Sequence, residues 1–151
     1  MKNNGLNVFW SNKIVDLLFK KGVKHACISP GSRNTPLINA FINYPKIKCF
    51  SNFDERSNAF FALGIAKKSL DPVVILTTSG TATANLFPAI IEGSLTMVPL
   101  IILTADRPGN LIDSGENQTI NQINLYGDYV RKMENFNKNK STTMLKKIDS
   151  V

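Results

Sequence analysis

An acidic pair and a base, Asp54-Glu55-Arg56, stand where an apolar run ends and a helical pattern of small and apolar residues begins. Asp54 is suited to cap the helix, and Glu55 in the first turn complements the positive end of the helix dipole without any ligand. Alternatively, Glu55 is shielded by apolar neighbours and shares a proton with a ligand nitrogen. The spacing alone leaves both interpretations open.

A second polar segment, SPGSRN at 29–34, has the composition of an anion-binding turn. Gly31 permits close approach of the backbone, and Ser32 and Arg33 precede a helix whose N-terminus favours negative charge. An arginine also grips a carboxylate with two hydrogen bonds. A plain turn with a solvated arginine is equally compatible with these residues. The segment is no Walker A loop, because it lacks the Gly-Lys-Ser/Thr ending.

Two further segments are candidates for ligand contact. TTSGT at 77–81 places Thr78 and Gly80 where backbone amides could meet a ring or a phosphate, although helix capping explains these residues more simply. The segment 104–118 contains Arg107 and, beyond it, Asn117 and Gln118. A solvated loop is the alternative, but loops of this length in compact domains are often functional.

Hydrophobic periodicity and turn residues predict the elements that position these groups. The expected helices cover 7–21, 36–43 with Thr35 as N-cap and Pro36 in the first turn, 55–69, a stretch that opens in SGTATAN and runs to about 95, and about 119–126. The expected strands cover 23–29, 47–53, 72–78, 98–105 and about 129–136. Pro88 requires the fourth helix either to kink or to begin later than the SGTATAN segment.

This alternation predicts an α/β fold: three layers, with a mostly parallel sheet and helices on both faces. The predicted domain covers 1–136, and the polar residues 137–151 are expected to be a disordered tail. In such sheets ligands lie outside the carboxyl ends of the strands. Each of the four polar segments directly follows a predicted strand, so we expect them to meet at one edge.

Composition excludes several other function classes. The net charge is +7, but the lysines are scattered and form no basic stripe with aromatics, which argues against nucleic-acid binding. Cys27 and Cys49 lack the spacing of a metal or redox motif and predict buried thiols in a reducing compartment. His25, the one histidine, precedes a strand at the opposite edge, so no Ser-His-Asp set or metal cluster is expected. The start has no signal-peptide pattern and the apolar runs are too short to span a bilayer, so cytoplasm is expected and no membrane partner.

Five segments together resemble one family of thiamine diphosphate enzymes. They are SPGSRNTPL, NFDERSNAFFALGIAKKSLDPV, TTSGTATANLFPAIIEG, VPLIILTADRPGNLIDSGENQTINQ and LYGDYV. From about residue 8 to 136 the chain is similar to the N-terminal, pyrimidine-binding domain of MenD. MenD is the 2-succinyl-5-enolpyruvyl-6-hydroxy-3-cyclohexene-1-carboxylate synthase of menaquinone and phylloquinone biosynthesis. One small departure is Asn34, where the family more often has serine.

The resemblance implies a role for each candidate residue. Glu55 matches the catalytic carboxylate that hydrogen-bonds N1′ of the cofactor's aminopyrimidine and favours its imino tautomer. Thr78 and Gly80 match positions that line the pyrimidine pocket. The enzymes decarboxylate 2-oxoglutarate and add the succinyl unit to isochorismate. The positions that hold these acidic substrates are matched by Ser32, Arg33, Arg107, Asn117 and Gln118.

The resemblance also implies what the chain needs from elsewhere. Family members hold the diphosphate and Mg²⁺ (or Mn²⁺) on a further domain with a Gly-Asp-Gly…Asn motif, which these residues do not contain. We therefore expect no turnover by this chain alone, and either self-association or a polypeptide carrying the C-terminal domain as partner. The alternatives are a truncated, non-catalytic binding or dimerisation module, and the pyrimidine domain of another such enzyme, for example acetolactate synthase. Arg33 and the ADRP…NQ segment weigh against the last.

Overall fold

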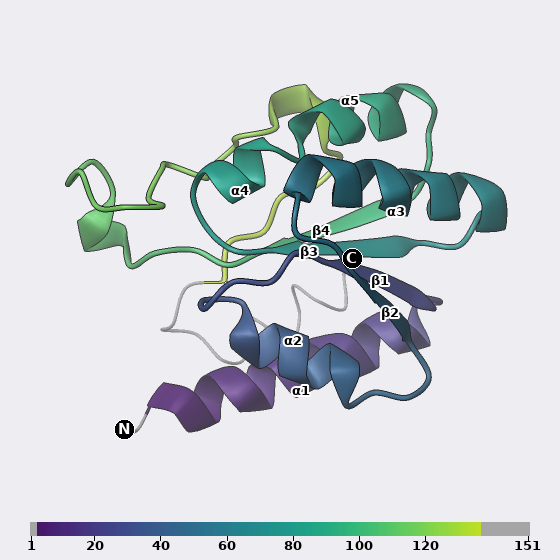
Figure 1. Ribbon diagram of the computed structural model, residues 1–151, viewed down its shortest axis with the longest axis horizontal. Helices are drawn as coiled ribbons and strands as arrows, with labels where there is room; N and C mark the ends of the chain where they lie inside the picture. The colour runs from purple at the N-terminus through teal and green to yellow at the C-terminus, as the bar shows by residue number, and fades with distance from the viewer. Residues whose placement is uncertain (1–2, 137–151) are drawn as a thin grey trace.

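A four-stranded parallel sheet lies between two layers of helices in the computed structural model, which describes residues 3–136 (Figure 1). The sheet order is β2-β1-β3-β4, which confirms the predicted α/β class. The strands are β1 (His25–Ile28), β2 (Lys48–Ser51), β3 (Val73–Thr77) and β4 (Leu100–Thr104). The helices are α1 (Asn3–Lys20), α2 (Thr35–Ile42), α3 (Glu55–Ser69), α4 (Thr81–Ala84) and α5 (Phe87–Leu95), with 3-10 turns η1 (Gly109–Leu111) and η2 (Gly127–Tyr129).

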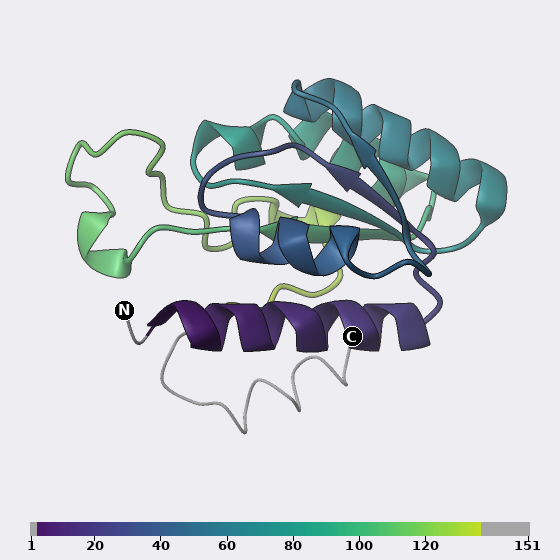
Figure 2. The same ribbon diagram turned by 60° about the horizontal axis from the view of Figure 1, so that its bottom comes forward.

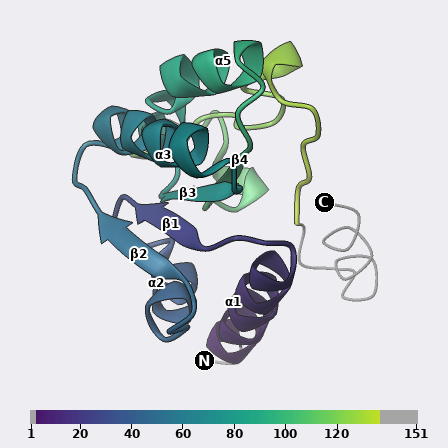
Figure 3. The ribbon, with the colours of Figure 1, turned by 90° about the vertical axis from the view of Figure 1, so that its right-hand side faces the viewer.

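Two apolar clusters hold the layers together, one on each face of the sheet. On one face α1 and α2 bury Val15, Leu18 and Phe41 against β1 and β3. On the other face α3 and α5 bury small residues and Ile90 against the same strands. Figure 3 shows the two helix layers on opposite sides of the sheet. Every residue of β3 is buried, as its β-branched run predicts for a strand covered on both faces.

Helix boundaries follow the local chemistry of the chain. The prediction for α3 is confirmed at both ends, with Asp54 as N-cap and Leu70 closing the helix in a left-handed conformation. Helix α4 ends at Ala84 and α5 begins at Phe87, with Pro88 in its first turn. A proline has no backbone N–H to give, so it fits a first turn and not a helix interior.

The start of α2 differs from the prediction by one residue. Asn34 is the N-cap and Thr35 is already helical, with Pro36 in the first turn as expected. The Thr35 hydroxyl donates back to the carbonyl of Ser32 at 2.9 Å and to that of Gly31 at 3.4 Å. Its side chain therefore closes the preceding turn and caps nothing. Helix α1 also begins earlier than predicted, at Asn3.

The helix predicted at 119–126 and the strand predicted at 129–136 are both wrong. Residues 119–122 have no regular structure and 123–126 form a turn, after which the short η2 is the last element within the described residues. Gln118 and Asn124 have positive φ angles of 53° and 55°, which interrupt a right-handed helix. The aromatic rings of Tyr126 and Tyr129 pack on Phe87 of α5, which draws this segment away from strand pairing.

Two further expectations concern the end of the chain and membrane association. Residues 137–151, predicted to be a disordered tail, lie outside the described residues. Within residues 3–136, none of the helices has the length and apolar character needed to cross a bilayer.

Candidate functional site

The carboxyl ends of the four strands meet at one edge of the sheet, as predicted for the four polar segments. All three strand pairs are parallel. Backbone hydrogen bonds continue beyond the strands, since Ser29 N donates to Leu76 O at 2.8 Å and Ala105 N donates to Thr77 O at 3.1 Å. Figure 2 shows the long segment after β4 extending past this edge. His25 lies at the opposite edge, where its ring stacks on Phe50.

Glu55 occupies the first position of α3, at this edge. The Asp54 carboxylate accepts a hydrogen bond from Ser57 N at 2.7 Å and so caps the helix. This backbone bond holds the pKa of Asp54 below its usual value. Glu55 is half-buried, and its Oε2 accepts a hydrogen bond from Asn85 Nδ2 at 3.1 Å. Asn85 directly follows α4, so this bond joins the first turn of α3, which follows β2, to the end of α4, which follows β3.

The arginine-bearing turn after β1 packs directly on the turn after β3. A Cβ placed on Gly31 would lie 2.6 Å from the Cβ of Thr78, so only glycine fits there. Thr78 is buried, while Ser32 is exposed and Arg33 half-buried. Among residues 3–136 the Arg33 guanidinium has no ion-pair partner. An unpaired guanidinium at this edge suits a carboxylate ligand.

Arg107 is held at the same edge by the loop that follows it. Its backbone N–H bonds to the Asp106 carboxylate at 2.7 Å, and Nη2 donates to the carbonyl of Asn117. Its Nε is buried and has no partner among the described residues. A buried donor without an acceptor is costly, so an anion that reached this nitrogen would relieve the cost. Asn117 and Gln118 are themselves exposed.

The glycine of the β3 turn lies beneath the backbone of Gln118. Gly80 has φ +78°, and a Cβ there would lie 2.6 Å from the Gln118 carbonyl carbon. The Ser79 hydroxyl donates to Gln118 O at 2.9 Å. Gly80 N donates to Gln122 Oε1 at 2.9 Å, while Gln122 Nε2 donates to Ala105 O at 3.0 Å. The Gly80 amide, predicted to contact a ligand, is therefore hydrogen-bonded within the protein. The glycine is needed there because it lets the backbone of Gln118 approach closely.

The sequence pattern predicts that the four turns meet, but not which side chains join them. Ser79 and Gln122 bind the 118–122 segment to the β3 turn, and three buried polar residues support the β1 and β2 turns: Ser29, Asn34 and Asn58. Asn34, the departure from the resembled family, makes a buried bond to Ser29 O at 2.9 Å. The partners lie up to 42 residues apart, so no local spacing could have identified them.

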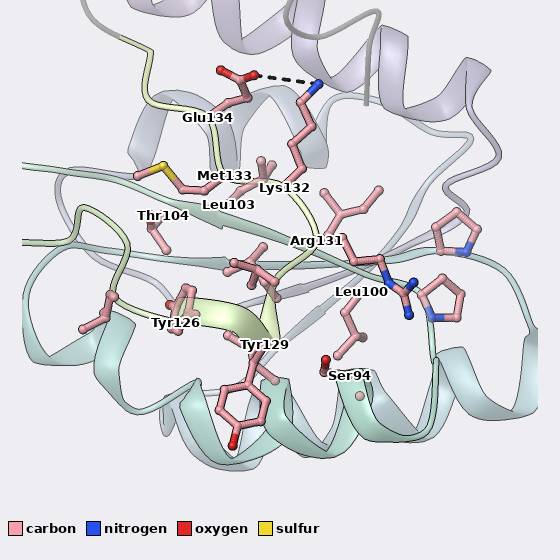
Figure 4. A pocket seen from close by; sticks show the side chains of 18 of the residues that line it. Ser94, Leu100, Leu103, Thr104, Tyr126, Tyr129, Arg131, Lys132, Met133 and Glu134 are labelled. Carbon is pink, nitrogen blue, oxygen red and sulfur yellow. Dashed lines mark ion pairs between the residues drawn. The ribbon is translucent and has the colours of Figure 1, made fainter.

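A cleft runs alongside β4. It encloses about 780 Å³ and is lined by α1, α5, β4 and residues 122–136 (Figure 4). Its surface is mainly apolar, with a Lys132–Glu134 ion pair at the rim. None of the predicted site residues lines it. The described residues also contain no group of three or more His, Cys, Asp or Glu side chains that could hold a metal ion.

The arrangement fits a ring nitrogen at Glu55 and anions at the two arginines. A half-buried carboxylate held by an amide can accept or share a proton. Arg33 offers a guanidinium at this edge, and Arg107 offers a buried Nε that has no partner within residues 3–136. The profile described as "Thiamine pyrophosphate enzyme, N-terminal TPP binding domain" matches residues 10–125.

Three curated relatives of the chain carry the name 2-succinyl-5-enolpyruvyl-6-hydroxy-3-cyclohexene-1-carboxylate synthase. The protein of Haloarcula marismortui is 54% identical over 126 residues, which is 83% of this chain and 21% of the relative. The Histophilus somni protein is 53% identical over 132 residues, covering 85% and 23%. The Roseiflexus castenholzii protein is 51% identical over 125 residues, covering 83% and 22%. The chain thus spans about a fifth of the length of the relatives it matches.

Proposed function

The chain belongs to the family of thiamine pyrophosphate enzymes, through the N-terminal TPP-binding domain, and we propose that it is the pyrimidine-binding part of a 2-succinyl-5-enolpyruvyl-6-hydroxy-3-cyclohexene-1-carboxylate synthase. The single observation that carries the proposal is the position of Glu55. Its half-buried carboxylate stands at the carboxyl edge of the sheet, held by Asn85.

Glu55 is the proposed catalytic residue. Its carboxylate hydrogen-bonds N1′ of the pyrimidine and exchanges a proton there, while Asn85 keeps the carboxylate oriented. Thr78 and the Gly80 backbone shape the ring's pocket from the β3 turn. When bound, thiamine diphosphate supplies the electron sink for decarboxylation; the protein supplies placement and proton control.

The acidic substrates are proposed to bind beside the ring. Both 2-oxoglutarate and isochorismate carry two carboxylates, and charge-assisted bonds from arginine suit such groups. Arg33 and Arg107 are assigned to them, and Ser32, Asn117 and Gln118 add hydroxyl and amide contacts from exposed positions. The support is that Arg33 is without an ion-pair partner among the described residues and that Arg107 Nε is buried and unsatisfied.

The binding sites for the metal ion and the diphosphate are proposed from the resemblance to the MenD family. Mg²⁺ or Mn²⁺ and the diphosphate are assigned to a separate C-terminal domain, which reaches this edge through self-association or as a partner polypeptide. Phe53, directly before the Asp54 cap of α3, is exposed at this edge, which supports a covered surface there. We place the reaction in the cytoplasm, in menaquinone or phylloquinone synthesis, and take 1–136 as the domain.

Turnover by a chimera tests this function. The chain replaces the matching segment of the Histophilus somni relative, and the product is followed with thiamine diphosphate, Mg²⁺, 2-oxoglutarate and isochorismate. The proposal predicts condensation dependent on both substrates. Condensation of pyruvate in its place would favour an acetolactate synthase, and a folded chimera without turnover on either pair would favour a non-catalytic module.

A further inference from the structure

Ser29, directly after β1, is a buried junction between three elements. Only 1% of its surface is exposed. Its N–H donates to Leu76 O of β3 at 2.8 Å, and its carbonyl accepts from Asn34 Nδ2 at 2.9 Å, at the start of α2. Its hydroxyl oxygen accepts from Asn58 Nδ2 of α3 at 3.0 Å. One serine therefore contacts the strand and the two helices around the candidate site.

Asn58 extends the junction to the first turn of α3. It is fully buried and lies three residues after Glu55. Its backbone N–H bonds to Asp54 O at 3.0 Å, and its Oδ1 accepts from Asn52 Nδ2 at 3.0 Å. Asn52 N in turn donates to Ile28 O at 3.1 Å. The turn that presents Glu55 is thus fastened to the end of β1 by side chain and backbone.

A buried amide is an expensive choice for a position that packing alone could fill. Burying a polar group costs free energy unless it is hydrogen-bonded, so apolar residues would serve a plain core better. A connected set of buried hydrogen bonds has an effect that apolar packing lacks, because it specifies one geometry for the groups it joins. The geometry joined here is that of the turn carrying Arg33 and the turn carrying Glu55.

We propose that Ser29, Asn34 and Asn58 form a positioning network that sets Glu55 and the arginine turn at a fixed separation. The inference rests on the proposed function, which assigns the ring to Glu55 and a carboxylate to Arg33. Ser29, Asn34 and Asn58 do not touch the ligands themselves; they position Glu55 and Arg33, which do. A separate contact, Gly31 against Thr78, holds the arginine turn against the turn after β3.

Amide hydrogen exchange in the ¹⁵N-labelled chain tests the network without any turnover. Asn58→Ala removes the link between α3 and Ser29. The network predicts that exchange rises about 10-fold at 31–35 as well as at 55–58, because the two turns open together. Ser29→Ala produces the same pattern, and the double variant stays within about 2-fold of the larger single effect, since residues in one network are not additive. Ser11→Ala, at a buried serine on α1, is the matched control and leaves both turns unchanged.

Thiamine is the probe for the link to function. In the native chain, NMR shifts at 55–58 and 77–85 report its binding. Asn58→Ala weakens that binding about 10-fold, as expected when a group that orients a ligand-binding residue is lost. Asn52→Ala removes only the bond from half-buried Asn52 to Asn58, so it gives a smaller change of the same pattern. It replaces Asn58→Ala in the experiment if that variant does not fold. Exchange that rises only at 55–58, or single effects that add, overturns the network. Absence of any thiamine shift in the native chain contradicts the proposed function instead, and the exchange result still decides the network.

Discussion

Replacing Gly80 by alanine tests how the long loop is fixed on the β3 turn. The backbone at Gly80 has φ +78° and ψ −139°, a region that only glycine adopts readily. Holding alanine there costs about 2 kcal/mol. A Cβ would also lie 2.6 Å from the Gln118 carbonyl carbon, so the loop must move. That movement loses the hydrogen bonds from Ser79 to Gln118 and from Gly80 to Gln122, worth about 1 kcal/mol each.

The expected loss is therefore about 2–4 kcal/mol of unfolding free energy, and a fall in Tm of about 5–15 °C. Urea unfolding measures it, and NMR shifts at 117–122 report the displaced loop. Gly64→Ala is the matched control, because a Cβ there meets nothing within 4 Å in the interior of α3; it should stabilise by about 0.5–1 kcal/mol. A Gly80→Ala chain within about 0.5 kcal/mol of the native chain, with unchanged shifts, would refute the reasoning.

Three further predictions address single contacts. Asp54→Ala should fray the start of α3, which faster amide exchange at Ser57 would show. Folding lowers the pKa of Asp54 from its ordinary 3.8, so the stability that this carboxylate adds is present above that pH and is lost as the pH falls through the folded pKa. The native and variant chains should therefore have the same stability in acid. Gln122→Ala should cost about 1–3 kcal/mol in urea unfolding by leaving the Gly80 amide without its acceptor, and an unchanged midpoint would contradict that bond. Burial raises the pKa of the Cys27 thiol to about 12, so a disulfide reagent at pH 8 should modify it slowly in the folded chain and rapidly in urea; equal rates would show that the site is open.

The sequence predicted what depends on local pattern. The period of apolar residues and the Asp54 cap located α3 at both ends, and the β-branched run identified β3 as the covered central strand. Parallel pairing then placed the four polar turns at one edge without any knowledge of contacts. These features are set by neighbours in the chain, which a pattern can record.

What the sequence could not predict depends on distant partners. Ser29 meets Asn58 across 29 residues, and Gly80 meets Gln122 across 42. The segment after Gln118 was predicted as helix and strand from its apolar residues. Its path is instead determined by two positive φ angles and by Tyr126 packing on Phe87. Tertiary contacts overrode local propensity there.

Glu55→Gln in the Histophilus somni chimera tests the central claim most directly. Glutamine keeps the size of the side chain and a hydrogen bond with Asn85, but cannot exchange a proton with the ring. The account predicts that kcat falls by about 10²–10⁴-fold while the chimera folds normally. Glu92→Gln, at an exposed glutamate of α5, should leave kcat unchanged. Full activity of the Glu55→Gln chimera would contradict the role assigned to this carboxylate.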